Sequence, residues 1–234
     1  MPRCWNPATP PTSSKSAQCG SRFHASDCDG QRDQPCRVPA DIQRNDFLAE
    51  GGKLWPLVAD VAKANGLLGN LRSISSAARN AGLQTVIVPH HRADPSDFEH
   101  WDHPTPYQLG AHQMQIFAKG NWGGDWFPEF APREGDLVAT EHWGSSGFAN
   151  TNLDSLLKQR GVSRIILIGL IANTCIETTA KYGVELGYHV TLVRDATAAA
   201  SQDAMRSAHD INAPTYAHAV VTTDQVLAAM AAMT

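Results

Sequence analysis

The sequence predicts an α/β fold, with a mostly parallel sheet and helices on both of its faces. From Asp46 onward, short β-branched or fully apolar runs alternate with segments of helical periodicity, which is the order of repeated β-α units. The run Ile165–Ile168 is apolar at every position, as in a central parallel strand that helices cover on both sides. A chain of 234 residues with 42% hydrophobic content can bury one sizeable core, so one domain is the simpler expectation.

The longest predicted helix covers Leu57–Ala81, where apolar residues recur at spacings near three and four. We expect a break at Gly66, and Gly82 ends the helix because glycine readily adopts the conformation of a helix C-terminus. The other strands are expected at Thr85–Val88, Leu137–Thr140, Val190–Val193 and Ala219–Thr222, and the other helices near Leu153–Arg160, Cys175–Leu186, Ser201–Asp210 and Thr223–Met233.

Charge and composition exclude several classes of partner. The formal net charge is −4, and the charges are scattered without a long run of one sign, so we expect no nucleic-acid partner. No apolar stretch approaches the roughly 18 residues of a membrane span, and the N-terminus lacks the apolar core of a signal peptide. We therefore expect a soluble, cytoplasmic protein that acts on a small molecule and has no membrane partner.

Two segments differ in composition from the rest of the chain. Residues 1–40 are rich in proline, and Val38 is their only Ile, Leu or Val, so we expect a disordered or atypical N-terminal segment there and the folded domain over 41–234. The interval 90–132 is rich in His, Pro and Trp. A loop of that length is usually functional, and we expect it to cover the carboxyl ends of the strands, where open α/β sheets bind ligands.

Cys175 follows the most apolar strand and begins a predicted helix. At such a position the positive end of the helix dipole and free backbone N–H groups favour thiolate over thiol, and the same N–H groups can hold an oxyanion. Cys175 is therefore a candidate nucleophile for acyl transfer. The alternative is that it is a small buried hydrophobic residue.

The residues around Cys175 carry a resemblance to a known family. The stretches Gly169-Leu-Ile-Ala-Asn-Thr-Cys175-Ile-Glu-Thr-Thr-Ala and Phe148-Ala-Asn-Thr-Asn-Leu-Asp154 resemble two neighbouring segments of the isochorismatase-like cysteine hydrolases. The resemblance implies a three-layer α/β/α Rossmann-like sandwich and an oligomeric protein, so we expect a homo-oligomer. It also implies an Asp–Lys–Cys triad with Cys175 as nucleophile.

A further implication of the resemblance is a cis peptide bond at Leu170–Ile171. That bond would aim the N–H of Ile171, together with that of Cys175, at the substrate carbonyl oxygen. The implied mechanism is attack by the thiolate, an acyl-enzyme formed with loss of an amine, and attack by water.

The Asp of the triad falls in a segment that departs from the family pattern. Asp41-Ile-Gln-Arg-Asn-Asp46-Phe47 resembles a D-x-Q-x-D-F-like motif but is one residue longer, which makes Asp41 the candidate base and Phe47 a candidate substrate contact. We expect Cys36-Arg-Val-Pro-Ala40 not to form the central strand that precedes this motif, because Pro39 lacks a ladder donor. One hypothesis explains these departures: residues 1 to about 44 derive from a shifted reading frame or an altered 5′ region.

The position of the family's Lys is occupied by His142, and no lysine lies between Lys119 and Lys158. His142 is the candidate source of positive charge beside the thiolate, with weaker pairing because imidazole is mostly neutral at pH 7. The alternatives are that His142 only orients its loop, or that the alignment moves to Glu141 or Thr140 and the third member is missing.

The stretch from Lys119 to Trp126 combines a cation, glycines and two indoles. Lys119, Trp122 and Trp126 are candidate substrate-binding residues on a lid, or contacts with a neighbouring subunit. An ordinary loop anchored by its tryptophans is the alternative.

Four histidines, His90, His91, His100 and His103, partly resemble the metal site of nicotinamidase-like members. The acid expected two residues before His91 is absent. We therefore expect no cofactor and interpret these residues as a surface or lid cluster, with a divalent ion as the alternative.

The leading functional prediction is a hydrolase that cleaves a small amide or carbamoyl C–N bond through an acyl-enzyme on Cys175. Asp41 would accept the thiol proton and pass it to the leaving amine. Two other hypotheses stay open. One is a catalytically impaired relative that serves as a binding or oligomeric scaffold, and the other is a vinyl-ether hydrolase of the isochorismatase type, whose members have no Cys at this position.

Overall fold

The computed structural model describes residues 36–41 and 44–233, so the disorder expected for residues 1–35 lies outside the described part of the chain. The strands are β1 (Cys36–Asp41), β2 (Thr85–Ile87), β3 (Leu137–Val138), β4 (Arg164–Leu170), β5 (His189–Ala198) and β6 (Ala219–Val221). The helices are α2 (Asn45–Leu48), α3 (Trp55–Ala64), α4 (Leu67–Asn80), α5 (Pro106–Gln113), α6 (Leu153–Lys158), α7 (Glu177–Glu185), α8 (Gln202–Arg206) and α9 (Thr223–Ala231).

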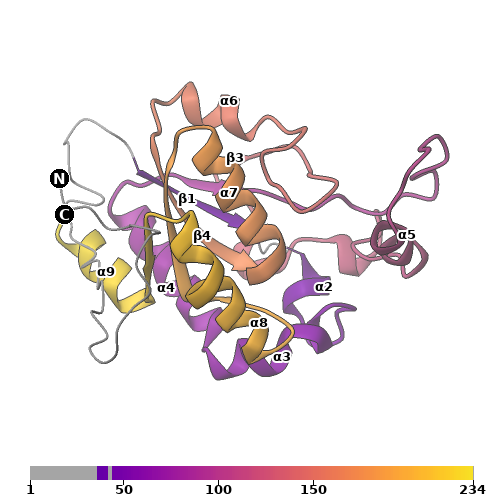
Figure 1. The fold of residues 1–234 in the computed structure, drawn as a ribbon, viewed down its shortest axis with the longest axis horizontal. Helices are drawn as coiled ribbons and strands as arrows, with labels where there is room; N and C mark the ends of the chain where they lie inside the picture. Colours follow the sequence, from indigo (N-terminus) through magenta and orange to yellow (C-terminus); the bar gives the residue numbers. More distant parts are fainter. Residues whose placement is uncertain (1–35, 42–43, 234) are drawn as a thin grey trace, which may run out of the picture.

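The six strands form one sheet in the order β3-β2-β1-β4-β5-β6, and every pairing between them is parallel. In chain order, β2 and then β3 are added on one side of β1, and β4, β5 and β6 are added on the other side of β1. The strand order therefore reverses between β1 and β4, and open α/β sheets bind their ligands at such a position. The arrows of β1 and β4 point toward the side of the molecule that carries α2 and α5 (Figure 1).

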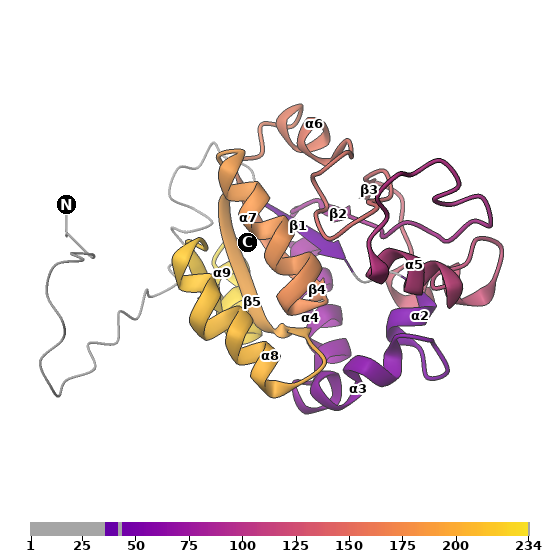
Figure 2. The same cartoon turned by 45° about the vertical axis from the view of Figure 1, so that its right-hand side comes forward.

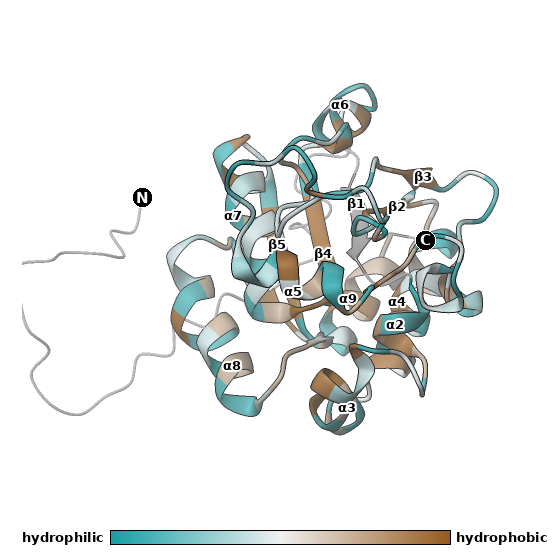
Figure 3. Ribbon diagram, turned by 90° about the vertical axis from the view of Figure 1, so that its right-hand side faces the viewer, coloured by the Kyte–Doolittle hydropathy of each residue, from teal (hydrophilic) through white to brown (hydrophobic). Residues whose placement is uncertain are grey.

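Side chains of β4 enter two separate cores because neighbouring strand residues point to opposite faces. Ile166 and Ile168 pack with residues of α3, α4 and α9, whereas Ile165 and Leu167 pack with residues of α6 and α7. Figure 2 shows α4 and α7 on opposite sides of the sheet, and β4 is coloured as a hydrophobic strand in Figure 3. The α/β/α sandwich predicted from the sequence is confirmed.

The long helix predicted over Leu57–Ala81 is present as α3 and α4, broken as expected at Gly66, which has φ +64°. Gly82, with φ +70°, follows the end of α4. Both glycines occupy left-handed conformations that other residues adopt at a cost. None of the described helices is long and apolar enough to cross a membrane.

The expectation that Cys36–Ala40 is no central strand is wrong. These residues belong to β1, which lies between β2 and β4, with Val38 opposite Thr85 and Ala40 opposite Ile168. Proline removes one N–H donor only, and the other residues of a six-residue strand still bond to both neighbours. The sheet therefore begins within the segment that was expected to be atypical.

The interval 90–132 is an ordered structure that contains one helix not predicted from the sequence. Helix α5 begins with a capping box, in which the Gln108 N–H donates to the Thr105 hydroxyl and the Thr105 N–H donates to the Gln108 side chain. Each bond satisfies a donor that the helix itself leaves unpaired. Two short turns of 3₁₀ helix, Trp122–Gly124 and Pro128–Phe130, complete the interval.

Candidate active site

Cys175 lies in a turn of π helix, Ala172–Ile176, that joins β4 to α7. Regular α-helix begins at Glu177, slightly later than the start expected near Cys175. The backbone N–H groups of Thr174 and Ile176 both donate to the carbonyl of Ile171, which fixes the turn. The cysteine is 8% exposed, and the Thr174 hydroxyl lies 3.8 Å from its Sγ atom. The thiol therefore sits at the carboxyl end of the central strand and before the N-terminus of α7.

The peptide bond between Leu170 and Ile171 is cis, at the position that the resemblance implied. It directly precedes the turn that carries Cys175. The use of the Ile171 and Cys175 N–H groups to hold an oxyanion stays a prediction.

Asp41 is the last residue of β1, and its backbone is paired with Gly169 of β4. The sheet thus brings the ends of β1 and β4 side by side, next to the turn of Cys175. The role predicted for the Asp41 side chain lies outside the described part of the structure.

His142 is completely buried at the carboxyl end of β3. Its Nδ1 lies 2.7 Å from the Gly144 carbonyl oxygen, and because a carbonyl only accepts, Nδ1 carries the proton of this hydrogen bond. The ring packs edge-on against His90, with centroids 4.9 Å apart. His142 therefore occupies a fixed position behind His90, which lines the pocket described next.

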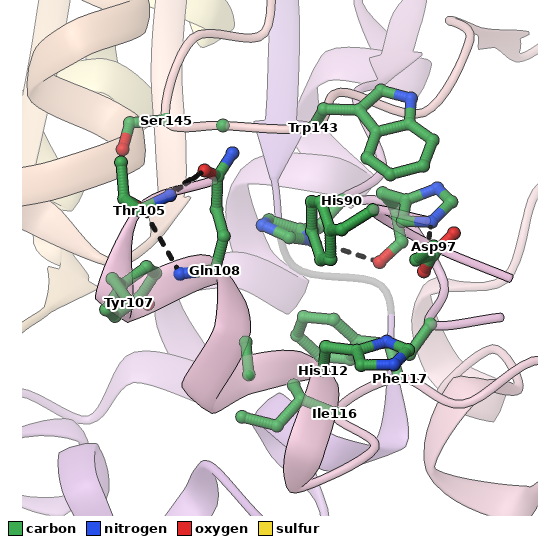
Figure 4. Close-up of a pocket in the computed structure, with 15 residues that line it drawn as sticks. His90, Asp97, Thr105, Tyr107, Gln108, His112, Ile116, Phe117, Trp143 and Ser145 are labelled. Carbon is green, nitrogen blue, oxygen red and sulfur yellow. Dashed lines mark hydrogen bonds and ion pairs between the residues drawn. The ribbon is translucent and has the colours of Figure 1, made fainter. Parts of the chain in front are cut away.

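A pocket of about 230 Å³ lies between α5, the residues that follow β2 and the segment 143–145 (Figure 4). Tyr107 of α5 lines it, and desolvation together with the nearby charge of Cys175 raises the pKa of this tyrosine. Tyr107 is 70% exposed, so its ring projects from the segment 90–132, here called the lid, rather than into the core. The pocket residue His90 follows β2, and Cys175 follows β4, so the pocket and the thiol lie at the same carboxyl edge of the sheet.

The four predicted substrate-binding residues do not line this pocket. Phe47 is buried, and its ring lies 4.9 Å from that of Phe117, which forms part of the pocket wall. The guanidinium group of Arg44 lies over the Trp126 ring. Trp122 is 53% exposed, and the Nζ atom of the exposed Lys119 lies 3.6 Å from the Asp94 carboxylate. Phe47 and Lys119 each contact the pocket wall, since the Lys119 N–H donates to the carbonyl of the lining residue Ala93 at 2.9 Å.

Asp46 holds the lid to the body of the protein. Its buried carboxylate accepts hydrogen bonds from the N–H of Phe117 at 2.7 Å and from the N–H of Lys53 at 3.0 Å. A methyl group on Gly123 would overlap this carboxylate. Asp46 thus positions two separate parts of the lid, at residues 117 and 123.

Glu141 joins two arginines beside the pocket. It accepts from Arg44 Nη2 at 2.9 Å and from Arg92 Nε at 2.6 Å. Arg44 is 4% exposed, donates to the Gly124 carbonyl and stacks over Trp126 at 3.9 Å, and its burial lowers its pKa to about 10. The residue that made the Asp41 motif too long is therefore an integral part of the structure.

The predicted histidine cluster is divided by the fold. His91 lies 2.9 Å from Asp97 and stacks on Trp143 with ring centroids 3.5 Å apart, whereas His100 and His103 are exposed on the lid. Over residues 36–41 and 44–233, no three His, Cys, Asp or Glu side chains gather in a way that could hold a metal ion.

Sequence reasoning missed Tyr107, Trp143 and the Arg44–Glu141 pair. A signal for the first existed, since Thr105-Pro106-Tyr107-Gln108 has the pattern of a capped helix start with proline at the first position. The pair of Arg44 and Glu141 is separated by 97 residues, and no local pattern indicates such a contact.

Comparison with known proteins agrees with this geometry. The model of the Isochorismatase domain family matches residues 37–225. The chain is 30% identical over 170 residues to the ureidoacrylate amidohydrolase RutB of Rhizobium rhizogenes, covering 68% of each protein, and 30% identical over 190 residues to that of Yersinia enterocolitica, covering 76% of the chain and 81% of the relative.

Two solved structures share the fold. A cysteine hydrolase from Pseudomonas syringae is 25% identical with a TM-score of 0.71, over 85% of this chain and 93% of the other. N-carbamoylsarcosine amidase from Thermoplasma acidophilum is 28% identical with a TM-score of 0.58, over 82% and 97% of the two chains. With the family model matching most of its length, this chain belongs to the isochorismatase family.

Proposed function

We propose that this protein hydrolyses a small amide or carbamoyl C–N bond through an acyl-enzyme on Cys175. The observation that carries the proposal is the position of Cys175 after the end of β4, at the same edge of the sheet as the pocket residue His90, which follows β2. The amidohydrolase and amidase relatives support hydrolysis of a non-peptide C–N bond.

The proposed reaction begins with attack of the Cys175 thiolate on the substrate carbonyl carbon, and the N–H groups of Ile171 and Cys175 hold the oxyanion. Asp41 takes the thiol proton and passes it to the leaving nitrogen as the C–N bond breaks. Water then attacks the thioester, which releases the acid and returns the proton to the thiol.

We further propose that His142 takes the place of the family's Lys. Because its Nδ1–H is committed to the Gly144 carbonyl, the proton that makes the ring cationic enters at Nε2. Protonated His142 would then lend positive charge to the site, as a lysine does at every pH near neutral. His142→Lys should extend activity toward higher pH, and His142→Gln should lower kcat and remove this pH dependence. Identical pH–rate profiles in all three proteins would reject this role.

The test of the main proposal is release of ammonia or amine from a panel of small amides, ureas and carbamates. Cys175→Ala should abolish release, and a mass increase on the peptide that contains Cys175 should appear on rapid quenching. Cys175→Ala that retains activity would instead favour the vinyl-ether type of chemistry, which needs no thiol.

Alkylation of Cys175 distinguishes the hydrolase hypothesis from the scaffold hypothesis. At pH 6 iodoacetamide should modify Cys175 faster than the free thiol of a short cysteine peptide added as a reference. A Cys175 that reacts no faster than this reference overturns the proposal and supports the scaffold.

A further inference from the structure

The walls of the pocket at the carboxyl edge of the sheet are mainly carbon. Phe98, Ile116, Phe117 and Trp143 line it, and the His91 ring stacks on Trp143 (Figure 4). Flat aromatic walls suit a flat, apolar group, because ring faces pack well against one another and release water.

The charged groups around the pocket are already paired. Asp97 is the only carboxylate among the described lining residues, and it accepts from His91 and from the Asp94 N–H. None of these lining residues is Lys or Arg. The nearby arginines, Arg44 and Arg92, both bond to Glu141.

The polar side chains of the pocket that have no partner are neutral. The hydroxyls of Tyr107 and Ser145 are at the pocket, and within the described residues neither makes a hydrogen bond to another group. His112 also lines the pocket, and its buried Nδ1 has no partner there. Such groups can bind an amide or a ring nitrogen, but they provide no fixed positive charge for a carboxylate.

We infer that the substrate carries a neutral, planar, aromatic or conjugated group, and that ureido acids with a free carboxylate are poor substrates of this protein. The inference rests on the proposed function. A carboxylate brought between Phe98, Phe117 and Trp143 would lose its hydration without gaining a cation, which is unfavourable. In this respect the pocket differs from what a substrate such as ureidoacrylate requires, since that molecule bears a carboxylate.

The kinetic test compares substrates with and without a free carboxylate. Ureidoacrylate and its methyl ester form one pair, and 4-carboxybenzamide and benzamide form the other, with release of ammonia as the measured quantity. The neutral member should have a kcat/KM at least about tenfold higher in each pair, because an unpaired polar group in an apolar pocket is strongly discriminated against. A preference for either acid overturns the inference and leaves the proposed hydrolase function intact.

A gain-of-function variant makes the test sharper. Ala111 lines the pocket from α5, so Ala111→Arg adds a cation there without removing a polar side chain. It should raise the kcat/KM of the acids relative to the neutral members, whereas Ala111→Met, of similar length and no charge, should not. Equal effects of both substitutions contradict the charge argument.

A binding measurement distinguishes this inference from the proposed function. Benzamide should protect Cys175 from iodoacetamide at concentrations where 4-carboxybenzamide gives no protection, whether or not either compound is hydrolysed. Absence of turnover with selective protection removes the hydrolase proposal alone. Protection by the acid at equal or lower concentration removes the inference on the neutral substrate.

Discussion

The Asp46 carboxylate accepts a hydrogen bond of 2.7 Å from the backbone N–H of Phe117, across 71 residues of sequence. Asp46 lies in α2, just beyond the end of β1, and Phe117 forms part of the wall of the pocket. One buried side chain therefore connects the segment that follows β1 to the lid.

Asp46→Ala should destabilise the protein and reduce its activity. The substitution leaves the buried N–H of Phe117 and the partly buried N–H of Lys53 without an acceptor, which should cost about 2–4 kcal/mol for two charge-assisted bonds. Urea denaturation measures the loss. The exposed Asp60 of α3 is a matched control, and an equal effect of Asp60→Ala would show that the hydrogen bonds of Asp46 are not responsible.

Gly123→Ala should also disturb the lid, for a steric reason. The added methyl group would overlap the Asp46 carboxylate, while the same group on Gly110 of α5 meets no atom within 4 Å. We expect Gly123→Ala to lower kcat/KM and thermal stability, and Gly110→Ala to leave both nearly unchanged. The comparison of melting temperatures checks this. A fully stable Gly123→Ala would show that the segment of Gly123 is not tightly packed against Asp46.

Glu141→Ala should lower the free energy of unfolding more than simultaneous replacement of both Arg44 and Glu141. It leaves the guanidinium of Arg44, 4% exposed, without its carboxylate, and an uncompensated buried charge costs about 3–5 kcal/mol. Replacing Arg44 by Met as well should recover part of this loss, because no buried charge then remains. A double-mutant cycle by urea denaturation measures the coupling, and additive losses would contradict it.

The fold was predictable because the residues of its core follow local patterns of apolar spacing in the sequence. Ile165–Ile168 is apolar on both faces, and in the structure its residues enter two different cores. Leu67, Leu71, Ile74 and Ala78 recur at helical spacing, and all are buried on one face of α4. Gly66 and Gly82 marked the ends of helices through backbone conformation alone.

The site was less predictable because its contacts are not local. Pro39 argued against a strand, but the pairing of β1 on both sides outweighs one missing donor. Composition distinguishes the lid from the rest of the chain, but the part that lines the pocket depends on α5, which begins with a capping box. The position of Cys175 was found because strand, turn and helix are consecutive in sequence, whereas the lid contacts of Asp46 join segments distant in sequence.

Folding stability should depend on the ionisation of His209. The Thr197 hydroxyl donates to the Arg194 carbonyl, so His209 Nε2 donates to Thr197. Desolvation is the main cause that lowers the pKa of this histidine, 4% exposed, from 6.5 to about 4. Between pH 6.5 and about pH 4 the unfolded chain binds a proton on His209 that the folded protein does not. The free energy of unfolding is therefore unaffected above pH 6.5 and decreases as the pH falls through this range. Wild type should lose roughly 2 kcal/mol more than His209→Gln between pH 7 and pH 5. Urea denaturation at both pH values measures this difference, and parallel losses in the two proteins would show that His209 does not control it.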